Sequence, residues 1–235
     1  MINDYSPELD ESDELDSHKV TFYQEIIGMM RWAIEIGRVD INMEVSLLSS
    51  YQAAPRLGHL EQLLRIMAFL RKKPKLTLYF DPSLPRIDES MFEGNDREQF
   101  LNHYRSAKEE IPIKMPKPRV RPVQITAFVD ASHAPNIMDR RSYTGYVIFI
   151  NRAPMMWYSK RQNTVESSAF WSELIAMKSC VKSIIGLRFK LRMFGIPFHS
   201  LTNVRCDNQS VVNNSSRLES KLNKKHSSVA YYATR

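Results

Sequence analysis

The chain has 235 residues, of which 43% are hydrophobic and 25% charged, so its length permits either one domain or two. Its two cysteines, Cys180 and Cys206, lie far apart and form no CxxC or Cys/His cluster, which argues against a disulfide framework and a zinc site. Apolar stretches long enough to span a bilayer are missing, so we expect no membrane partner.

Charge is distributed unevenly along the chain. Seven carboxylates and no Lys or Arg precede Lys19, and the residues from there onward carry 33 basic side chains against 19 acidic ones, a net charge of +14. This positive charge favours binding to a polyanion, for which nucleic acid is the usual candidate and an anionic membrane the weaker one. The acidic start is the opposite of a signal or transit peptide. We therefore expect an intracellular protein, cytoplasmic or nuclear, that is not secreted.

The N-terminal residues predict a leader followed by helices. Residues 1–18 are acidic and nearly free of large apolar side chains, so we expect a solvated, disordered leader there. Apolar residues then recur at steps of three and four over 22–36, which is the spacing of one helical face. A second helix is expected over 40–52.

The helical region continues after Pro55. Apolar residues with helical spacing run over 57–70 and lead into three consecutive cations at 71–73, where positive charge suits a helix C-terminus. A short strand is expected over 76–80. Residues 19–81 therefore form a predicted helical unit.

Residues 82–122 have the composition of a linker. They contain many of the prolines, including the run IPIKMPKPRVRP, and they lack sustained periodicity apart from a possible short helix over 100–108.

The character of the sequence changes after the linker. Short runs rich in β-branched and aromatic residues at 125–129, 143–150 and 155–158 predict three successive strands, which suggests an antiparallel meander. A long helix is expected over 168–193, then a strand over 203–206 and shorter helical pieces. The C-terminal part is thus predicted to be an α/β domain.

Three acidic residues are candidates for a catalytic, metal-binding site. Asp130 and Asp207 end predicted strands, and Glu173 lies about one turn into the long helix. Carboxylates gathered at one sheet edge repel one another, and a divalent cation removes that conflict. Oxygen ligands favour Mg²⁺ or Mn²⁺, and two such ions suit phosphodiester cleavage. Each acid also has an ordinary role as a turn former, a solvated helical residue or an N-cap, so spacing alone leaves both readings open.

Several sequence words resemble the ribonuclease H domain of copia-type LTR retrotransposons. In chain order they are VDASHA, RRSYTGYVIFINRAPMMWYSKRQNTV, SELIAM, KLRMFGIP, CDNQSVV and LNKKHSSVAYY. The words YQEIIGMMRWAIEIGRVDINMEVSLLSS and GHLEQLLRIMAFLRKKPK are similar to the stretch that closes the reverse transcriptase of the same Pol polyproteins. The resemblance covers most of the chain from about Thr21 onward.

The resemblance implies a fold and a site. Residues 123–235 would form a ribonuclease H-like mixed sheet, three antiparallel strands first, flanked by helices and preceded by the small helical region. Asp130 would bridge two Mg²⁺ or Mn²⁺ ions, while Glu173 and Asp207 complete the shell of the second. The substrate would be an RNA-DNA hybrid, and the rest of the Pol polyprotein would be a partner.

A basic loop precedes the Glu173 helix and is a candidate for phosphate contacts. Its residues are Lys160, Arg161, Gln162 and Asn163. A solvated basic loop is the alternative reading. His133, next to the VDAS word, is read as a surface residue that could instead line the cleft.

Activity is a separate expectation. The resemblance implies a fourth catalytic Asp, within an ADxxTK motif that comes later in the chain of family members. The sequence does not contain that motif, so we expect the domain to be C-terminally truncated. We therefore expect little hybrid-specific ribonuclease activity from residues 1–235. A catalytically dead genomic remnant and a nucleic-acid-binding or interaction module remain open as alternatives.

Overall fold

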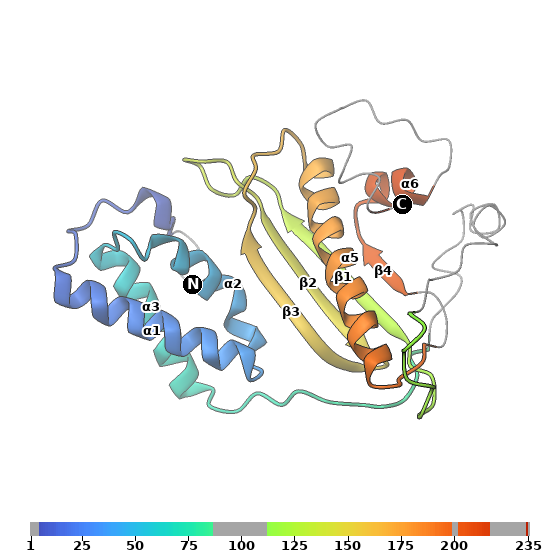
Figure 1. The fold of residues 1–235 in the computed structure, drawn as a ribbon. Helices are drawn as coiled ribbons and strands as arrows, with labels where there is room; N and C mark the ends of the chain where they lie inside the picture. The colour runs from blue at the N-terminus through green and yellow to red at the C-terminus, as the bar shows by residue number, and fades with distance from the viewer. Residues whose placement is uncertain (1–4, 87–111, 199–201, 217–233, 235) are drawn as a thin grey trace. The chain divides into compact units, whose positions relative to one another are not determined.

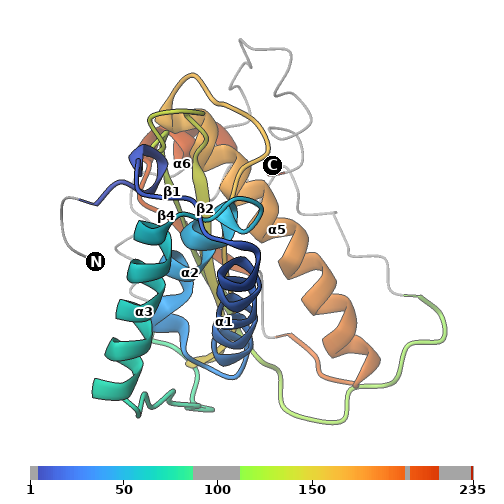
Figure 2. The same ribbon diagram turned by 90° about the vertical axis from the view of Figure 1, so that its left-hand side faces the viewer.

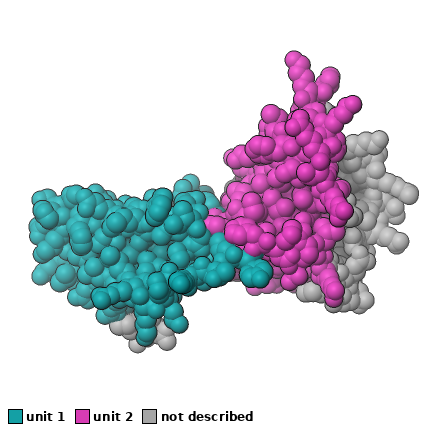
Figure 3. All heavy atoms as spheres, turned by 90° about the horizontal axis from the view of Figure 1, so that it is seen from below, with its two compact units in different colours: residues 1–79, 134–143, 158–165 teal, residues 80–133, 144–157, 166–235 magenta. Residues whose placement is uncertain are grey.

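The computed structural model describes residues 5–86, 112–198, 202–216 and 234. The chain forms two compact units, coloured separately in Figure 3. Unit 1 comprises Met1–Tyr79, Ala134–Tyr143 and Tyr158–Val165, and unit 2 comprises Phe80–His133, Thr144–Trp157 and Glu166–Arg235. Among the described residues, no helix combines the length and the apolar character that crossing a bilayer requires.

Unit 1 is built on three helices, α1 (Ser17–Glu35), α2 (Asn42–Leu48) and α3 (Leu57–Lys72). Helix α1 packs on both α2 and α3 (Figure 2). The apolar spacing that predicts these helices also fills their core, in which Tyr23 and Leu63 are fully buried. The buried Tyr23 hydroxyl donates to the Leu48 carbonyl at 2.8 Å, which links α1 to the end of α2.

The single helix expected over 40–52 is instead three short pieces. The 3-10 turns η2 (Val39–Ile41) and η3 (Ser49–Tyr51) flank α2. Ser49 Oγ bonds back to the Val45 carbonyl at 2.6 Å, a contact that competes with regular helix geometry. Residues 76–80, expected to be a strand, pair with no strand among the described residues, and Tyr79 is 80% exposed.

The acidic leader differs from the disordered segment predicted above, because its described residues pack on the start of α3. Leu57 N–H donates to the Asp13 carbonyl at 2.9 Å, and Gly58 N–H donates to Ser12 Oγ at 2.8 Å. The first N–H groups of a helix have no partners within it, so the leader satisfies donors that α3 leaves open. A Cβ on Gly58 would lie 1.9 Å from Asp10 Oδ2, so a larger residue there would displace the Asp10 carboxylate.

Unit 2 centres on a four-stranded mixed sheet with the order β3-β2-β1-β4 (Figure 1). The strands are β1 (Ile125–Ser132), β2 (Tyr143–Ile150), β3 (Ala153–Arg161) and β4 (Asn203–Cys206), and β2 and β3 each contribute residues to both units. A connection of two residues joins β2 to β3, which only an antiparallel pair permits. Its first residue, Asn151, has φ +56°.

Helix α5 (Ala169–Met193) packs on β1 and lies along one face of the sheet (Figure 1). Their shared core includes Ala127, Ile148 and Leu174, which are fully buried. Helix α6 (Gln209–Ser216) contacts α5. The predicted α/β class is confirmed, whereas the helix expected over 100–108 lies outside the described residues.

Candidate functional site

Two of the predicted acids lie at the same end of neighbouring parallel strands. Strands β1 and β4 pair in register, with Val129 opposite Cys206. Asp130 and Asp207 each follow directly in the chain, so parallel pairing brings them to one edge of the sheet. Glu173 is the fifth residue of α5, which packs on β1. The structure therefore brings all three acids together, from β1, from α5 and from the residue that follows β4.

Glu173 is the buried member of this cluster, with only 6% of its surface exposed. Burial is the main cause that raises the pKa of Glu173 to about 7, and the negative charge of Asp130 is the second. The Ala131 N–H donates to the carboxylate and lowers the pKa. The charge of Asp207 and a hydrogen bond shared with Asp130 raise the pKa further. Without a cation, Glu173 is therefore half protonated near neutral pH.

Cys206 is a fourth member that sequence reasoning missed. Its Sγ lies 3.9 Å from Glu173 Oε2, and potential ligand atoms of Glu173, Cys206 and Asp207 all lie within 4.8 Å of one another. Burial raises the pKa of this thiol to about 11, so it is neutral beside the acids. The adjacency of Cys206 to Asp207 was visible in the sequence, but its orientation depends on the β1-β4 register.

The ordinary roles considered for the strand acids are not those seen. Asn208, rather than Asp207, caps α6, because its Oδ1 accepts from the N–H groups of Ser210 at 3.1 Å and Val211 at 3.2 Å. Asp130 lies within β1 rather than in a turn, and it is exposed. Both carboxylates are thus in positions that a dissolved cation can reach.

His133 lies beside the cluster, as an exposed residue just after β1. Its Nδ1 is 3.2 Å from Ser172 Oγ, and that hydroxyl donates to the Ala169 carbonyl at 2.9 Å. The hydroxyl has a single proton and gives it to the Ala169 carbonyl. We therefore infer that His133 Nδ1–H donates to Ser172 Oγ. This contact connects His133 to the residue immediately before Glu173.

The predicted phosphate-contacting residues all belong to unit 1, whereas the three acids belong to unit 2. Arg161 Nη1 forms an ion pair with Asp139 at 2.9 Å, and the buried Gln162 donates its N–H to the Ser142 carbonyl at 2.7 Å. Lys160 and Asn163 are exposed. Only these two present polar side chains largely to solvent, and the role in substrate binding stays a prediction.

No protein-family profile matches the chain. The chain is 28% identical over 142 residues to the putative transposon Ty5-1 protein of Saccharomyces cerevisiae, covering 60% of this chain and 34% of that protein. It is 25% identical over 210 residues to the retrovirus-related Pol polyprotein from transposon TNT 1-94 of Nicotiana tabacum, covering 89% of this chain and 13% of the polyprotein.

A third similarity is to the secreted RxLR effector protein 161 of Plasmopara viticola, at 21% identity over 170 residues, or 72% of this chain and 94% of that protein. The chain spans about a third of the yeast transposon protein and about an eighth of the tobacco polyprotein. The two transposon relatives support an origin in a retrotransposon Pol polyprotein.

Proposed function

We propose that residues 123–235 form a ribonuclease H-type domain of a copia-type Pol polyprotein, which acts on the RNA strand of RNA-DNA hybrids. The observation that carries the proposal is the convergence of Asp130, Glu173 and Asp207 where α5 meets the ends of β1 and β4. The similarity to two transposon proteins supports the polyprotein origin, and the strand order β3-β2-β1-β4 is compatible with the fold.

The donor set fits a hard divalent cation. Three carboxylates supply oxygen ligands, which Mg²⁺ and Mn²⁺ prefer, whereas the neutral thiol of Cys206 is a poor ligand for them. The charges that act on Glu173 come from Asp130 and Asp207, so the cluster has a repulsion that a cation relieves. When bound, divalent cations would lower the pKa of the attacking water and offset charge on the leaving oxygen.

Each acid has a distinct part in this proposal. Asp130, exposed on β1, and Asp207, which follows the end of β4, would hold the cations from the solvent side. Glu173 is held by the Ala131 N–H, so its carboxylate is oriented before any cation arrives. Such preorganisation favours catalysis because little rearrangement is needed during the reaction.

The proposed substrate is recognised by shape rather than by sequence. An RNA-DNA hybrid differs from duplex DNA in groove shape and in its 2′-hydroxyls. Exposed Lys160 and Asn163 are candidates for contacts to its phosphates. The net charge of +14 carried from Lys19 onward favours association with any polyanion, and binding should weaken steeply as salt is added.

The first test is cation binding. Titration of residues 1–235 with Mn²⁺, followed by electron paramagnetic resonance, should show sites that Asp130→Asn and Glu173→Gln weaken by about tenfold or more. Glu25→Gln, which removes an exposed carboxylate on α1, is the matched control and should bind as the unmodified chain does. Equal Mn²⁺ affinity in all four proteins would rule out the site.

The second test is cleavage of a labelled hybrid. RNA release is measured in Mg²⁺ and in Mn²⁺ for the chain alone and for the chain extended by the ADxxTK-containing segment of a relative. We expect the extended protein to cleave and Asp130→Asn to abolish that cleavage. Cation binding without hybrid cleavage in either protein would favour the catalytically dead remnant.

A further inference from the structure

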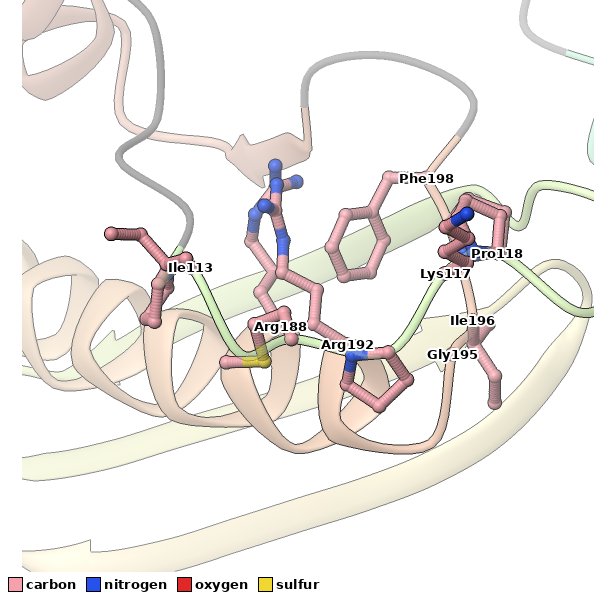
Figure 4. Close-up of a pocket in the computed structure, with 12 residues that line it drawn as sticks. Ile113, Lys117, Pro118, Arg188, Arg192, Gly195, Ile196 and Phe198 are labelled. Carbon is pink, nitrogen blue, oxygen red and sulfur yellow. The ribbon is translucent and has the colours of Figure 1, made fainter.

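A pocket of about 600 Å³ lies at the C-terminal end of α5 in unit 2 (Figure 4). Three stretches of the chain line it, namely residues 112–118, the last turns of α5, and residues 195–198. Arg188 and Arg192 are one helical turn apart on α5, and both line the pocket together with Lys117 and Phe198. None of the described residues that line it is acidic.

The pocket walls are held by backbone contacts. Arg119 N–H donates to the Gly195 carbonyl at 2.8 Å, and Val123 N–H donates to the Pro197 carbonyl at 2.9 Å. Gly195 has φ +73°, and a Cβ there would lie 3.0 Å from the Lys117 carbonyl, so a glycine lets the two segments approach. Four prolines in the lining further limit the motion of the pocket walls.

The chemistry of the lining combines cations with one aromatic face. The guanidinium carbons of Arg188 and Arg192 lie 4.2 Å and 5.2 Å from the centre of the Phe198 ring. Figure 4 shows both guanidinium groups beside that ring. Arg188 Nη1 also donates to Thr202 Oγ1 at 3.0 Å, which fixes its position. A planar group can stack here while an anion meets the guanidinium N–H donors.

The charges around the pocket favour an anion, although the pocket lies at the C-terminal end of α5. The C-terminus of a helix carries about half a negative charge, which disfavours anions there. Lys117, Arg188 and Arg192 place three full positive charges around the same pocket, and they outweigh it. The ligand class that matches both the charges and the aromatic ring is a phosphate joined to a planar base.

We propose that this pocket binds one nucleotide unit, with its phosphate at Arg188 and Arg192 and its base against Phe198 and the proline walls. The unit could be a free mononucleotide or part of a single strand, since both present the same chemistry. This nucleic-acid contact is separate from the carboxylate cluster. Glu173 and Arg188 are fifteen positions apart on α5, a distance of about 22 Å along the helix.

The distance between the sites predicts a length dependence. In a stacked strand, at about 3.4 Å per nucleotide, roughly seven nucleotides extend from the pocket to the acids. A stacked strand shorter than this can occupy only one of the two sites. Binding to the pocket alone should therefore not require a divalent cation.

The test is the affinity of a fluorescein-labelled single-stranded octanucleotide for residues 1–235 in EDTA, measured by anisotropy over a range of salt. The double variant Arg188→Gln/Arg192→Gln should bind about tenfold more weakly, and the slope of log affinity against log salt should fall by about one to two. The matched control Lys182→Gln/Lys190→Gln removes two exposed charges from the same helix outside the pocket, and it should lose about twofold or less.

Phe198→Leu separates stacking from charge. It keeps all cations and should weaken binding by roughly fivefold or more while the salt slope stays unchanged. Circular dichroism and thermal unfolding check that each variant is folded. If Phe198→Leu fails to fold, photocrosslinking of a 5-bromouridine octanucleotide to the unmodified chain replaces it, and the crosslink should map to the peptide that contains Phe198.

Competition with AMP distinguishes the two sources of the nucleotide. Displacement of the octanucleotide by millimolar AMP would identify a mononucleotide site, and its absence would identify a strand site. Equal losses in the two double variants, or a crosslink that maps outside the pocket, would overturn the proposal in favour of general electrostatic attraction. Because the measurement is made in EDTA, its failure is distinct from failure of cation binding by the three acids.

Discussion

Replacing Glu173 with Gln tests the electrostatic conflict within the carboxylate cluster. Burial and the charge of Asp130 raise the pKa of Glu173 from its ordinary value of 4.5 to about 7. At about 1.4 kcal/mol per pH unit, this difference corresponds to about 3 kcal/mol between the two protonation states. Gln is neutral at every pH and keeps an acceptor for the Ala131 N–H. It should therefore stabilise the cation-free protein at alkaline pH.

The sign of the pH dependence follows from proton binding. Between pH 4.5 and pH 7 the folded state holds a proton on Glu173 that the unfolded state has released, so the stability due to the neutral form is lost as pH rises through about 7. The difference in unfolding free energy between Glu173→Gln and the unmodified chain should be near zero at about pH 4 and about 3 kcal/mol at about pH 8.

The assay is urea unfolding in EDTA at both pH values, followed by tryptophan fluorescence, to which the buried Trp171 contributes from unit 2. Glu25→Gln, the exposed control, should have the same unfolding free energy as the unmodified chain at both pH values. Addition of Mg²⁺ at alkaline pH should stabilise the unmodified chain more than Glu173→Gln, because only the former keeps all three carboxylates. A Glu173→Gln protein that is no more stable at pH 8 than at pH 4, relative to the unmodified chain, would refute the reasoning.

Three further outcomes can be checked by unfolding experiments. Tyr23→Phe leaves the Leu48 carbonyl without its buried donor and should cost about 1–2 kcal/mol, measured by urea titration at neutral pH. Leu174→Ala removes a fully buried side chain between α5 and the sheet and should cost about 2–5 kcal/mol; a cost below about 1 kcal/mol would contradict its place in the core. Gly195→Ala should cost about 1–2 kcal/mol, because its φ is +73° and the new Cβ would meet the Lys117 carbonyl; a melting temperature equal to that of the unmodified chain would argue against this backbone geometry.

Local sequence patterns predicted most elements of unit 2. The strands expected over 143–150 and 203–206 have those bounds in the structure, and the helix expected over 168–193 begins one residue later. These predictions succeed because strand and helix propensities act between near neighbours. The strand expected over 76–80 is not seen, since a strand also needs a paired neighbour, which its own residues cannot supply.

The leader shows a different limit of sequence reasoning. Its acidic composition suggested solvation, yet Ser12 and Asp13 accept hydrogen bonds from the first turn of α3, more than forty residues later in the chain. Composition describes how a segment interacts with water, whereas the open N–H groups of a distant helix become partners only in the folded chain.

The sequence by itself determined the identities of the three acids, the elements that bear them and the basic character of the chain. Only the tertiary structure decided that Asp130, Glu173 and Asp207 converge, that Cys206 joins them and that Asn208 takes the capping role. The physical reason is the parallel pairing of β1 with β4, whose register is a contact between strands more than seventy residues apart. The packing of α5 on β1 then buries Glu173 and raises its pKa, and that property exists only in the assembled site.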